Sequence, residues 1–181
     1  MKVDDIKKAV VVGGGVMGSG IALVCSKTLP VDLVDVSPEA LDGSQARLRS
    51  YLSVLVENGL WDQEEGEVAL GRIRRTTDLA SALDGAGIVL EAVPEVMALK
   101  KEDFQRLDRL APPQTVLSTY TSSFRIGEIA SATGRPGHVV GIHWINPPYI
   151  MPIVEIVRGE ATSQETLELA KRGHGQVVGV V

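Results

Sequence analysis

The segment that most constrains the fold of this chain is Gly13-Gly14-Gly15-Val16-Met17-Gly18, which fits the pattern G-x-G-x-x-G. It follows a short apolar run at residues 9–12 and opens a stretch of helical character at residues 16–27. In that context the glycines allow a tight turn, close approach of the backbone to a pyrophosphate, and packing of helix on strand. The N-terminus of the helix offers free N–H donors to phosphate oxygens. We therefore predict a dinucleotide-binding loop formed by Gly13, Gly15, Val16, Met17 and Gly18.

Asp35 narrows the choice of dinucleotide. It closes a second apolar run, predicted as a strand at residues 31–36, about twenty residues after the central glycines. A carboxylate there accepts hydrogen bonds from the adenosine ribose and repels a 2′-phosphate, and no arginine follows it in Val36-Ser37-Pro38. The pattern favours NAD over NADP. The alternative interpretation is a tight glycine turn without a ligand and a solvated aspartate at a strand end.

Apolar runs alternate with amphipathic helical segments along the chain, a pattern typical of a parallel sheet covered by helices. Helical sequence from residue 38 to about residue 70 is interrupted at Asn58-Gly59, which predicts a helical hairpin inserted after the second strand. We expect an α/β fold of Rossmann type, with a doubly wound, mostly parallel sheet and helices on both faces. Residues 1–181 form one NAD-binding domain in this interpretation. The predicted strands are residues 9–12, 31–36, 73–76, 88–93, 116–118, 139–143, 153–157 and a final run from residue 176.

Composition excludes several classes of protein. A hydrophobic share of 44% and a charged share of 23% indicate an ordinary soluble domain, and the formal net charge of −5 gives no general attraction for nucleic acid or anionic membranes. A single cysteine, Cys25, rules out an internal disulfide and is expected to pack in a helix. No signal peptide or membrane-spanning run is recognisable. We expect a cytoplasmic protein with a small-molecule substrate, no metal site, and neither nucleic acid nor membrane as partner.

Candidate catalytic groups lie in the second half of the chain. His143 ends an apolar run, where an open α/β sheet places its ligands, and imidazole suits the removal of a hydroxyl proton near neutral pH. Glu155 interrupts another apolar strand, where a carboxylate needs a partner, and His143 is the natural one. Both residues taken singly are also compatible with purely structural roles. Ser122 follows a third strand and is either a hydrogen-bond donor to a substrate or a helix cap.

Taken together, these residues resemble the 3-hydroxyacyl-CoA dehydrogenase family across essentially the whole chain. The similar features, in order, are Gly13–Gly20 with Met17-Gly18-Ser19-Gly20-Ile21-Ala22, Asp35, Glu91-Ala92-Val93-Pro94-Glu95 with Lys100, Thr121-Ser122-Ser123, Gly141-Ile142-His143 with Asn146-Pro147, and Val154-Glu155. The resemblance implies NAD-dependent oxidation of an L-3-hydroxyacyl-CoA to the 3-ketoacyl form, in fatty acid metabolism.

The resemblance also implies roles for single residues. His143 matches the catalytic base and Glu155 its acidic partner, while Ser122 and Asn146 match groups that hydrogen-bond the reacting oxygen. Glu95 and Lys100 match positions that face the ribose and nicotinamide side of the cofactor. The family continues into a C-terminal helical domain that forms a homodimer and closes the active site. That domain is absent from these 181 residues, and the apolar run that stops at Val181 leads us to expect further residues beyond it.

Some residues depart from the family pattern. Tyr120 stands where the family usually has asparagine, which alters the surroundings of the nicotinamide and narrows the pocket. The segment Asn146-Pro147-Pro148-Tyr149 is also similar to dehydrogenases of gulonate and carnitine, which act without CoA, so a free 3-hydroxy acid is an alternative substrate. Arg47 and Arg49 in the hairpin are expected to form a solvated face rather than bind CoA phosphates. A third hypothesis is a non-catalytic NAD-binding module, against which the His143 and Glu155 pair argues.

Overall fold

The computed structural model describes residues 6–151, 153–173 and 177–180 of the chain. Its strands are β1 (Ala9–Val12), β2 (Val31–Val34), β3 (Ile73–Thr76), β4 (Ile88–Glu91), β5 (Val116–Thr119), β6 (Val139–Trp144), β7 (Val154–Val157) and β8 (Val177–Val180). Its helices are α1 (Val16–Ser26), α2 (Pro38–Glu57), α3 (Gln63–Gly71), α4 (Leu79–Leu83), α5 (Met97–Leu110), α6 (Ile126–Ala130) and α7 (Gln164–Gly173), with a 3-10 turn, η2 (Pro136–His138).

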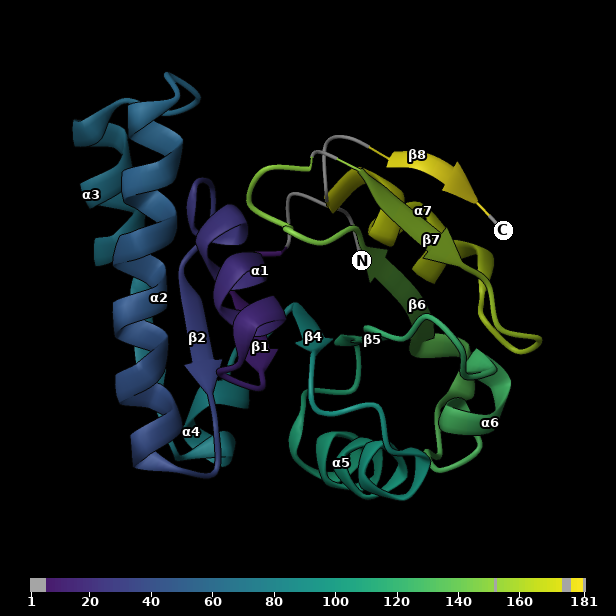
Figure 1. Ribbon diagram of the computed structural model, residues 1–181. Helices are drawn as coiled ribbons and strands as arrows, with labels where there is room; N and C mark the ends of the chain where they lie inside the picture. Colours follow the sequence, from purple (N-terminus) through teal and green to yellow (C-terminus); the bar gives the residue numbers. More distant parts are fainter. Residues whose placement is uncertain (1–5, 152, 174–176, 181) are drawn as a thin grey trace.

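These strands form a single sheet in the order β3-β2-β1-β4-β5-β6-β7-β8. From β3 to β6 every neighbouring pair is parallel, whereas β7 runs antiparallel to β6 and β8 runs parallel to β7. The chain starts at β1, extends to one side through β2 and β3, and then crosses to β4 on the other side of β1 (Figure 1). In such sheets, ligands bind beyond the C-terminal ends of the strands at this reversal point. The prediction of a doubly wound, mostly parallel sheet is confirmed.

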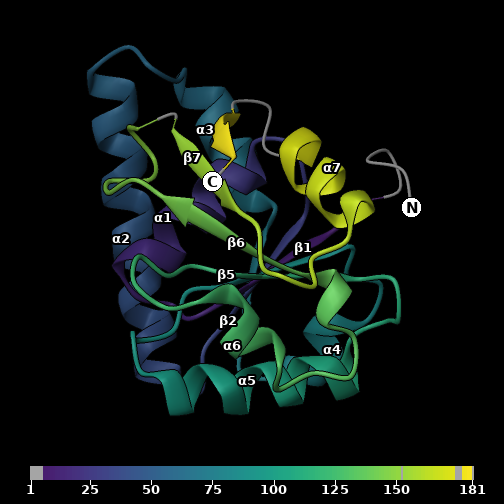
Figure 2. The ribbon, with the colours of Figure 1, turned by 90° about the vertical axis from the view of Figure 1, so that its right-hand side faces the viewer.

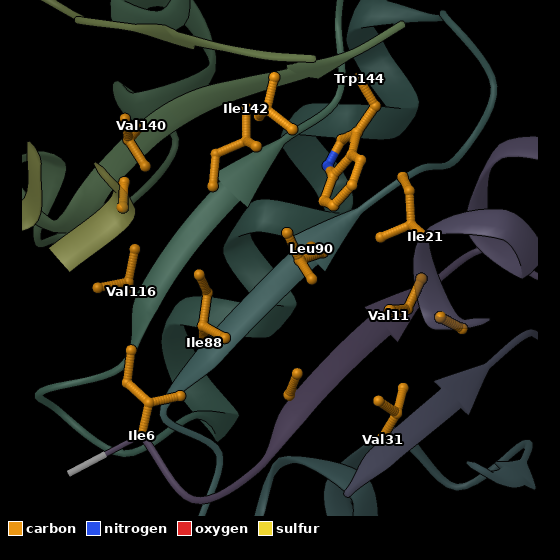
Figure 3. Close-up of a cluster of buried hydrophobic side chains, with 14 of the residues drawn as sticks. Ile6, Val11, Ile21, Val31, Ile88, Leu90, Val116, Val140, Ile142 and Trp144 are labelled. Atoms are coloured by element: carbon orange, nitrogen blue, oxygen red, sulfur yellow. The ribbon is translucent and has the colours of Figure 1, made fainter. Parts of the chain in front are cut away.

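Two hydrophobic cores lie on opposite faces of the sheet, because successive side chains of a strand point to opposite sides. Val11 belongs to the first core and Val10 to the second. The first core lies under α1, α2 and α7, and Figure 3 shows its layer of strand side chains, among them Val140, together with Ile21 of α1. The second lies under α4, α5 and α6 and contains Phe104. Figure 2 shows these three helices on one side of the strands and α7 on the other.

The predicted helical hairpin after the second strand is present as α2 and α3, which project from one side of the molecule (Figure 1). The Ser37 hydroxyl caps α2 by accepting the Ala40 N–H at 3.1 Å, and Pro38 occupies the first turn. Gly59 adopts a φ of +66° in the turn between the helices. A Cβ on Gly66 would lie 2.1 Å from Leu52, so this glycine lets α3 pack closely on α2.

The observed elements differ from the predicted ones mainly at their ends. β2 ends at Val34 and β4 at Glu91, two residues earlier than predicted in each case, and α5 begins at Met97. Helix α4 was not predicted, because its five residues are too few to show helical periodicity. Its cap is the Asp78 carboxylate, which accepts a hydrogen bond from the Ser81 N–H at 3.0 Å. The predicted final strand is present at β8, while Gln176 and Val181 lie outside the described residues.

Cys25 lies on α1 and packs against the first core, as predicted. Burial raises the pKa of its thiol to about 12, so the sulfur stays protonated near neutral pH.

Candidate active site

The glycine loop joins β1 to α1 at the C-terminal edge of the sheet. Gly13 has a φ of +106°, and a Cβ on it would lie 2.6 Å from the carbonyl oxygen of Ala92. A Cβ on Gly18 would lie only 1.7 Å from the carbonyl oxygen of Gly13, so the loop excludes a side chain there. Gly15 differs from both, because a Cβ on it would meet no protein atom within 4 Å. The space beside Gly15 is therefore open to a ligand.

The start of α1 offers unused donors next to that space. Gly15 is the N-cap residue, and no side chain caps the helix. The first N–H groups of a helix, which here include those of Val16 and Met17, have no partner within the helix itself. An uncapped N-terminus beside a bare glycine fits a diphosphate, which supplies acceptors and negative charge. The loop that the sequence predicted as a dinucleotide site thus has the geometry that an NAD pyrophosphate requires.

Asp35 lies immediately beyond β2 and faces the glycine loop. Its Oδ2 accepts the Gly14 N–H at 2.7 Å, and its Oδ1 accepts the Ser37 N–H at 3.2 Å. The carboxylate is half-buried, so one side of it remains open to solvent. The residue therefore stands beside the phosphate loop, where the adenosine ribose of a dinucleotide would lie.

Arg47 does not form a solvated face, which corrects the expectation for the hairpin. Its Nη2 donates to the carbonyl oxygen of Gly14 at 2.6 Å, and its Nε donates to the Ser19 hydroxyl at 3.3 Å. These contacts could not be predicted from the sequence, because they depend on α2 crossing the start of α1. Arg49 is exposed, as expected, and its Nη1 lies 3.7 Å from Oε1 of Glu67.

His143 and Glu155 are brought together by the antiparallel pairing of β6 and β7, in which they are direct partners. The Nδ1 atom of His143 lies 2.7 Å from Oε2 of Glu155. The histidine side chain is 21% exposed and the glutamate 43%, so the pair is partly open to solvent rather than enclosed in the dry core. When Nδ1 carries the proton and donates it in a hydrogen bond to Glu155, Nε2 is left as the basic atom.

Ser122 and Asn146 are both exposed, at the same edge of the sheet. Ser122 lies just beyond β5, and Asn146 follows β6 at a cis peptide bond to Pro147. Neither side chain makes a hydrogen bond to any other residue that the structure describes. The hydroxyl of Ser122 does not cap α6, which has no side-chain cap. Both groups are therefore available to a ligand, although the structure does not bring them into contact with His143.

Glu91, at the end of β4, is a functional candidate that the sequence analysis did not single out. Its carboxylate is fully buried and accepts the Lys100 ammonium at 2.8 and 3.1 Å, the Thr119 hydroxyl at 2.5 Å and the Val93 N–H at 2.8 Å. Burial raises the pKa of Glu91, against the opposing effect of Lys100 and the other donors. The signal was a glutamate that closes the apolar strand Ile88–Glu91, where a charge requires a buried partner.

Lys100 therefore lies behind the site surface rather than on it. Its side chain is fully buried, and besides Glu91 it donates to the carbonyl oxygen of Tyr120 at 2.8 Å. Its Nζ lies 3.4 Å from Oε2 of Glu95. An ammonium with acceptors on these three residues holds the ends of β4 and β5 together.

Glu95 reaches the surface, with 38% of its side chain exposed. Its Oε1 accepts the hydroxyls of Thr121 at 2.5 Å and Ser123 at 3.0 Å. Partial burial alone would raise the pKa of Glu95, but these hydroxyls and the charge of Lys100 outweigh it and hold the pKa below its usual value. The site thus presents a fixed, ionised carboxylate.

Tyr120 interacts with both His143 and Glu95. Its ring stacks on the imidazole of His143 with 5.6 Å between centroids and 22° between planes. Burial, and to a lesser degree the charge of Glu95, raise the pKa of the phenol, which stays protonated. The described structure thus places the Tyr120 ring against the candidate base.

No group of three or more histidine, cysteine, aspartate or glutamate side chains in the described parts of the chain could hold a metal ion. Among the helices that the structure describes, none has the length and apolar character needed to cross a membrane.

Comparison with known proteins gives a consistent result. Residues 8–178 match the family model described as "3-hydroxyacyl-CoA dehydrogenase, NAD binding domain". A relative from Bacillus subtilis, named as a probable 3-hydroxybutyryl-CoA dehydrogenase, is 43% identical over 163 residues, which cover 90% of this chain and 56% of the relative. The chain thus spans little more than half the length of that relative.

Solved structures of the same kind superpose closely. A 3-hydroxybutyryl-CoA dehydrogenase from Escherichia coli matches with a TM-score of 0.89 and 37% identity, over 96% of this chain and 38% of that one. The M. tuberculosis protein FadB2 matches with a TM-score of 0.90 and 34% identity, over 96% and 63% of the two chains.

Proposed function

Because the chain belongs to the 3-hydroxyacyl-CoA dehydrogenase family, as an NAD-binding domain, we propose that its protein oxidises an L-3-hydroxyacyl-CoA to the 3-ketoacyl-CoA. The observation that carries this proposal is the 2.7 Å contact between His143 and Glu155 at the sheet edge where the glycine loop opens. A dinucleotide-binding module without chemistry would have no need for a histidine oriented by a carboxylate.

His143 acts as the general base in this proposal. Glu155 accepts a hydrogen bond from the N–H at Nδ1, which leaves the lone pair of Nε2 to take the proton of the 3-hydroxyl group. As the C3–H bond breaks, the hydroxyl oxygen becomes the ketone and His143 becomes an imidazolium, which the Glu155 carboxylate stabilises. Bound NAD⁺ supplies the hydride acceptor for C3. Ser122 and Asn146, both free of partners within the described chain, donate to the reacting oxygen.

The remaining site residues hold the cofactor. Asp35 accepts hydrogen bonds from the adenosine ribose, and the uncapped start of α1 binds the pyrophosphate. Glu95, fixed as a carboxylate by Thr121 and Ser123, accepts hydrogen bonds from the ribose next to the nicotinamide. Lys100 contributes by holding Glu95 and the main chain of Tyr120 in place.

Catalysis is tested with the protein in its full natural length, by NADH formation from 3-hydroxybutyryl-CoA and by the reverse reaction with acetoacetyl-CoA. We expect His143→Gln to lower kcat by about 10²- to 10⁴-fold, with NADH affinity unchanged because the glycine loop is intact. A wild-type protein that turns over no hydroxyacyl-CoA would contradict the proposal.

Cofactor choice is tested by Asp35→Ala, with Ser37→Ala, which lies in the same turn, as the control. We expect the aspartate variant to weaken NADH binding by about tenfold or more, the loss of a charged hydrogen bond, and to change NADPH binding far less. An NADPH loss as large as the NADH loss would show that Asp35 acts only through the Gly14 N–H of the loop and not on the ribose.

The alternative substrate is a free 3-hydroxy acid of the gulonate or carnitine type. A structural observation favours keeping it: both arginines of the hairpin have partners within the chain, Arg47 on Gly14 and Arg49 on Glu67, and no lysine occurs between Val31 and Leu99. The hairpin therefore offers few unpaired cations that could bind the phosphates of CoA. Comparing kcat/KM for 3-hydroxybutyryl-CoA with that for free 3-hydroxybutyrate, gulonate and carnitine decides between the two substrates.

We further propose that activity requires a C-terminal helical domain, that the complete protein is a homodimer, and that it is cytoplasmic. The basis is the family resemblance, together with the 56% share of the Bacillus subtilis relative that the chain covers. Sedimentation of the full-length protein tests the dimer, and fractionation of cells tests the location.

A further inference from the structure

The surroundings of His143 contain a contact that the proposed reaction leaves unexplained. Glu155 satisfies one nitrogen at the edge of the imidazole, but the face of the ring lies against Tyr120. These two side chains are the titratable groups in contact with His143 in the described structure, one from β7 and one from the residue after β5. Glu95 acts on Tyr120 in turn, from the segment before α5.

The main chain of Tyr120 is held from behind, independently of His143. Its N–H donates to the carbonyl oxygen of Glu91 at 2.7 Å, and its carbonyl oxygen accepts the Lys100 ammonium at 2.8 Å. Both main-chain groups are thus tied to β4 and α5, and Lys100 itself is fixed by the buried Glu91 carboxylate. The backbone that carries the stacked ring is therefore fixed in place relative to β4 and α5.

The aromatic face also bears on the charge of the histidine. The face of a tyrosine ring carries partial negative charge and attracts a cation placed over it. His143 becomes a cation when it accepts the hydroxyl proton, so a ring against its face favours the product of that step. The phenol oxygen contributes no hydrogen bond to the described residues, which leaves the ring itself as the interacting group.

We propose that Tyr120 is a positioning residue for His143, which holds the imidazole against Glu155 and stabilises its protonated form through the stacked face. The inference rests on the proposed role of His143 as base. It assigns a purpose to the buried Glu91 and Lys100 pair as well, since that pair fixes the backbone of Tyr120.

The test compares Tyr120→Leu, which removes the stacked ring, with Tyr120→Phe, the matched control that keeps the ring and removes only the hydroxyl. The first readout is the pH titration of the His143 imidazole followed by NMR, which needs no turnover. We expect the titration midpoint to fall by roughly half a pH unit in Tyr120→Leu, the loss of one exposed cation–π contact, and to stay within 0.2 units (on the order of the error) in Tyr120→Phe.

The direction of the shift separates this role from simple packing. Removing a ring that only shields His143 from water would raise the midpoint, because the charged form would become better solvated. An unchanged or raised midpoint in Tyr120→Leu therefore overturns the inference, and so does a fall of equal size in Tyr120→Phe.

The second readout is the pH dependence of turnover. Oxidation needs neutral His143 and reduction needs the protonated form, so we expect the limiting pH of both directions to move downward together in Tyr120→Leu. The kcat for oxidation should fall about two- to fivefold, with KM for NAD unchanged. A wild-type protein without activity would defeat the proposed function, while the NMR titration would still decide the role of Tyr120.

Discussion

Two carboxylates are buried near opposite ends of the strands of the same sheet, and the cations that pair with them differ in exposure. Asp32, near the N-terminal end of β2, accepts Nε and Nη2 of Arg74 at 2.7 and 2.8 Å and lies 3.2 Å from the ammonium of Lys8. Arg74 is 53% exposed, whereas Lys100, the partner of Glu91 at the C-terminal edge, is fully buried.

The difference follows from what each cation does besides pairing. Arg74 lies directly opposite Asp32 in the pairing of β2 and β3, so its ion pair ties two neighbouring strands. Lys100 also holds the main chain of Tyr120, which lies against the candidate base. A buried pair at the ligand-binding edge therefore supports the geometry of a site, while the pair at the far edge supports the sheet alone.

The largest effect is expected from Lys100→Met, which leaves the Glu91 carboxylate buried without its cation. We expect the free energy of unfolding to fall by about 3–5 kcal/mol, measured by urea denaturation at pH 7. The double variant Glu91→Gln with Lys100→Met removes both charges and should recover more than half of that loss. A single variant that loses less than about 1 kcal/mol would show that the pair is not desolvated as described.

Asp32→Asn should have a smaller effect, confined to stability. The variant loses charged hydrogen bonds from Arg74 and Lys8, for which we expect a loss of about 1.5–3 kcal/mol. NADH affinity, measured by fluorescence titration, should stay within about twofold because Asp32 is remote from the glycine loop. A marked loss of NADH affinity would show that Asp32 also affects the candidate cofactor site, and would contradict this prediction.

The pH dependence of stability should separate the two carboxylates by sign. Burial alone would raise the pKa of Asp32, but Arg74 and Lys8 hold it below the usual value, so its contribution is present above about pH 4 and is lost on acidification. The pKa of Glu91 is raised, chiefly by burial. The folded state therefore favours the protonated carboxyl, and the contribution of Glu91 to the free energy of unfolding decreases as the pH rises.

Between pH 6 and 3 (roughly the range in which carboxylates titrate), we therefore expect the free energy of unfolding of Asp32→Asn to fall less steeply than that of the wild type. The free energy of unfolding of Glu91→Gln should fall more steeply than that of the wild type. Parallel curves for wild type and both variants, from urea titrations at each pH, would contradict the assignment.

The smallest effect is expected from conservative exchange at the far edge. Arg74→Lys keeps the charge beside Asp32 but loses the bidentate contact. Because this side chain is exposed, the free energy of unfolding should fall by less than about 1 kcal/mol. Lys100→Arg is the matched exchange at the buried pair, where the larger guanidinium must fit a packed space, and it should cost about 1–3 kcal/mol. If both variants lost the same free energy of unfolding in urea denaturation, the two ion pairs would not differ as described.

The sequence predicted those features that short segments encode by themselves. The glycine loop, the order of strands and helices, the hairpin and the pairing of His143 with Glu155 all follow from local patterns read against one fold class. The contacts that it missed join segments distant in the chain. Lys100 stands in Leu99-Lys100-Lys101-Glu102, which is typical of a solvated helix face, and only the approach of α5 to the end of β4 buries it.

The contacts of Arg47 and Tyr120 could not be predicted for the same reason. The polar surroundings of Arg47 in α2 suggest solvent, yet the helix crosses the glycine loop and turns the guanidinium onto Gly14. The stacking of Tyr120 on His143 depends on β5 lying next to β6 in a particular register. Such contacts are properties of the sheet order, which no single segment contains.

The glycine loop is held on two sides before any ligand arrives. Asp35 binds the N–H of Gly14, and Arg47 binds its carbonyl oxygen, so the peptide units around this residue have little freedom left to lose. A ligand that docks on a preorganised loop avoids most of the ordering entropy that a floppy loop would impose on binding. The affinity of this domain for its dinucleotide is therefore set in part by a carboxylate and a guanidinium that act on the backbone of the loop.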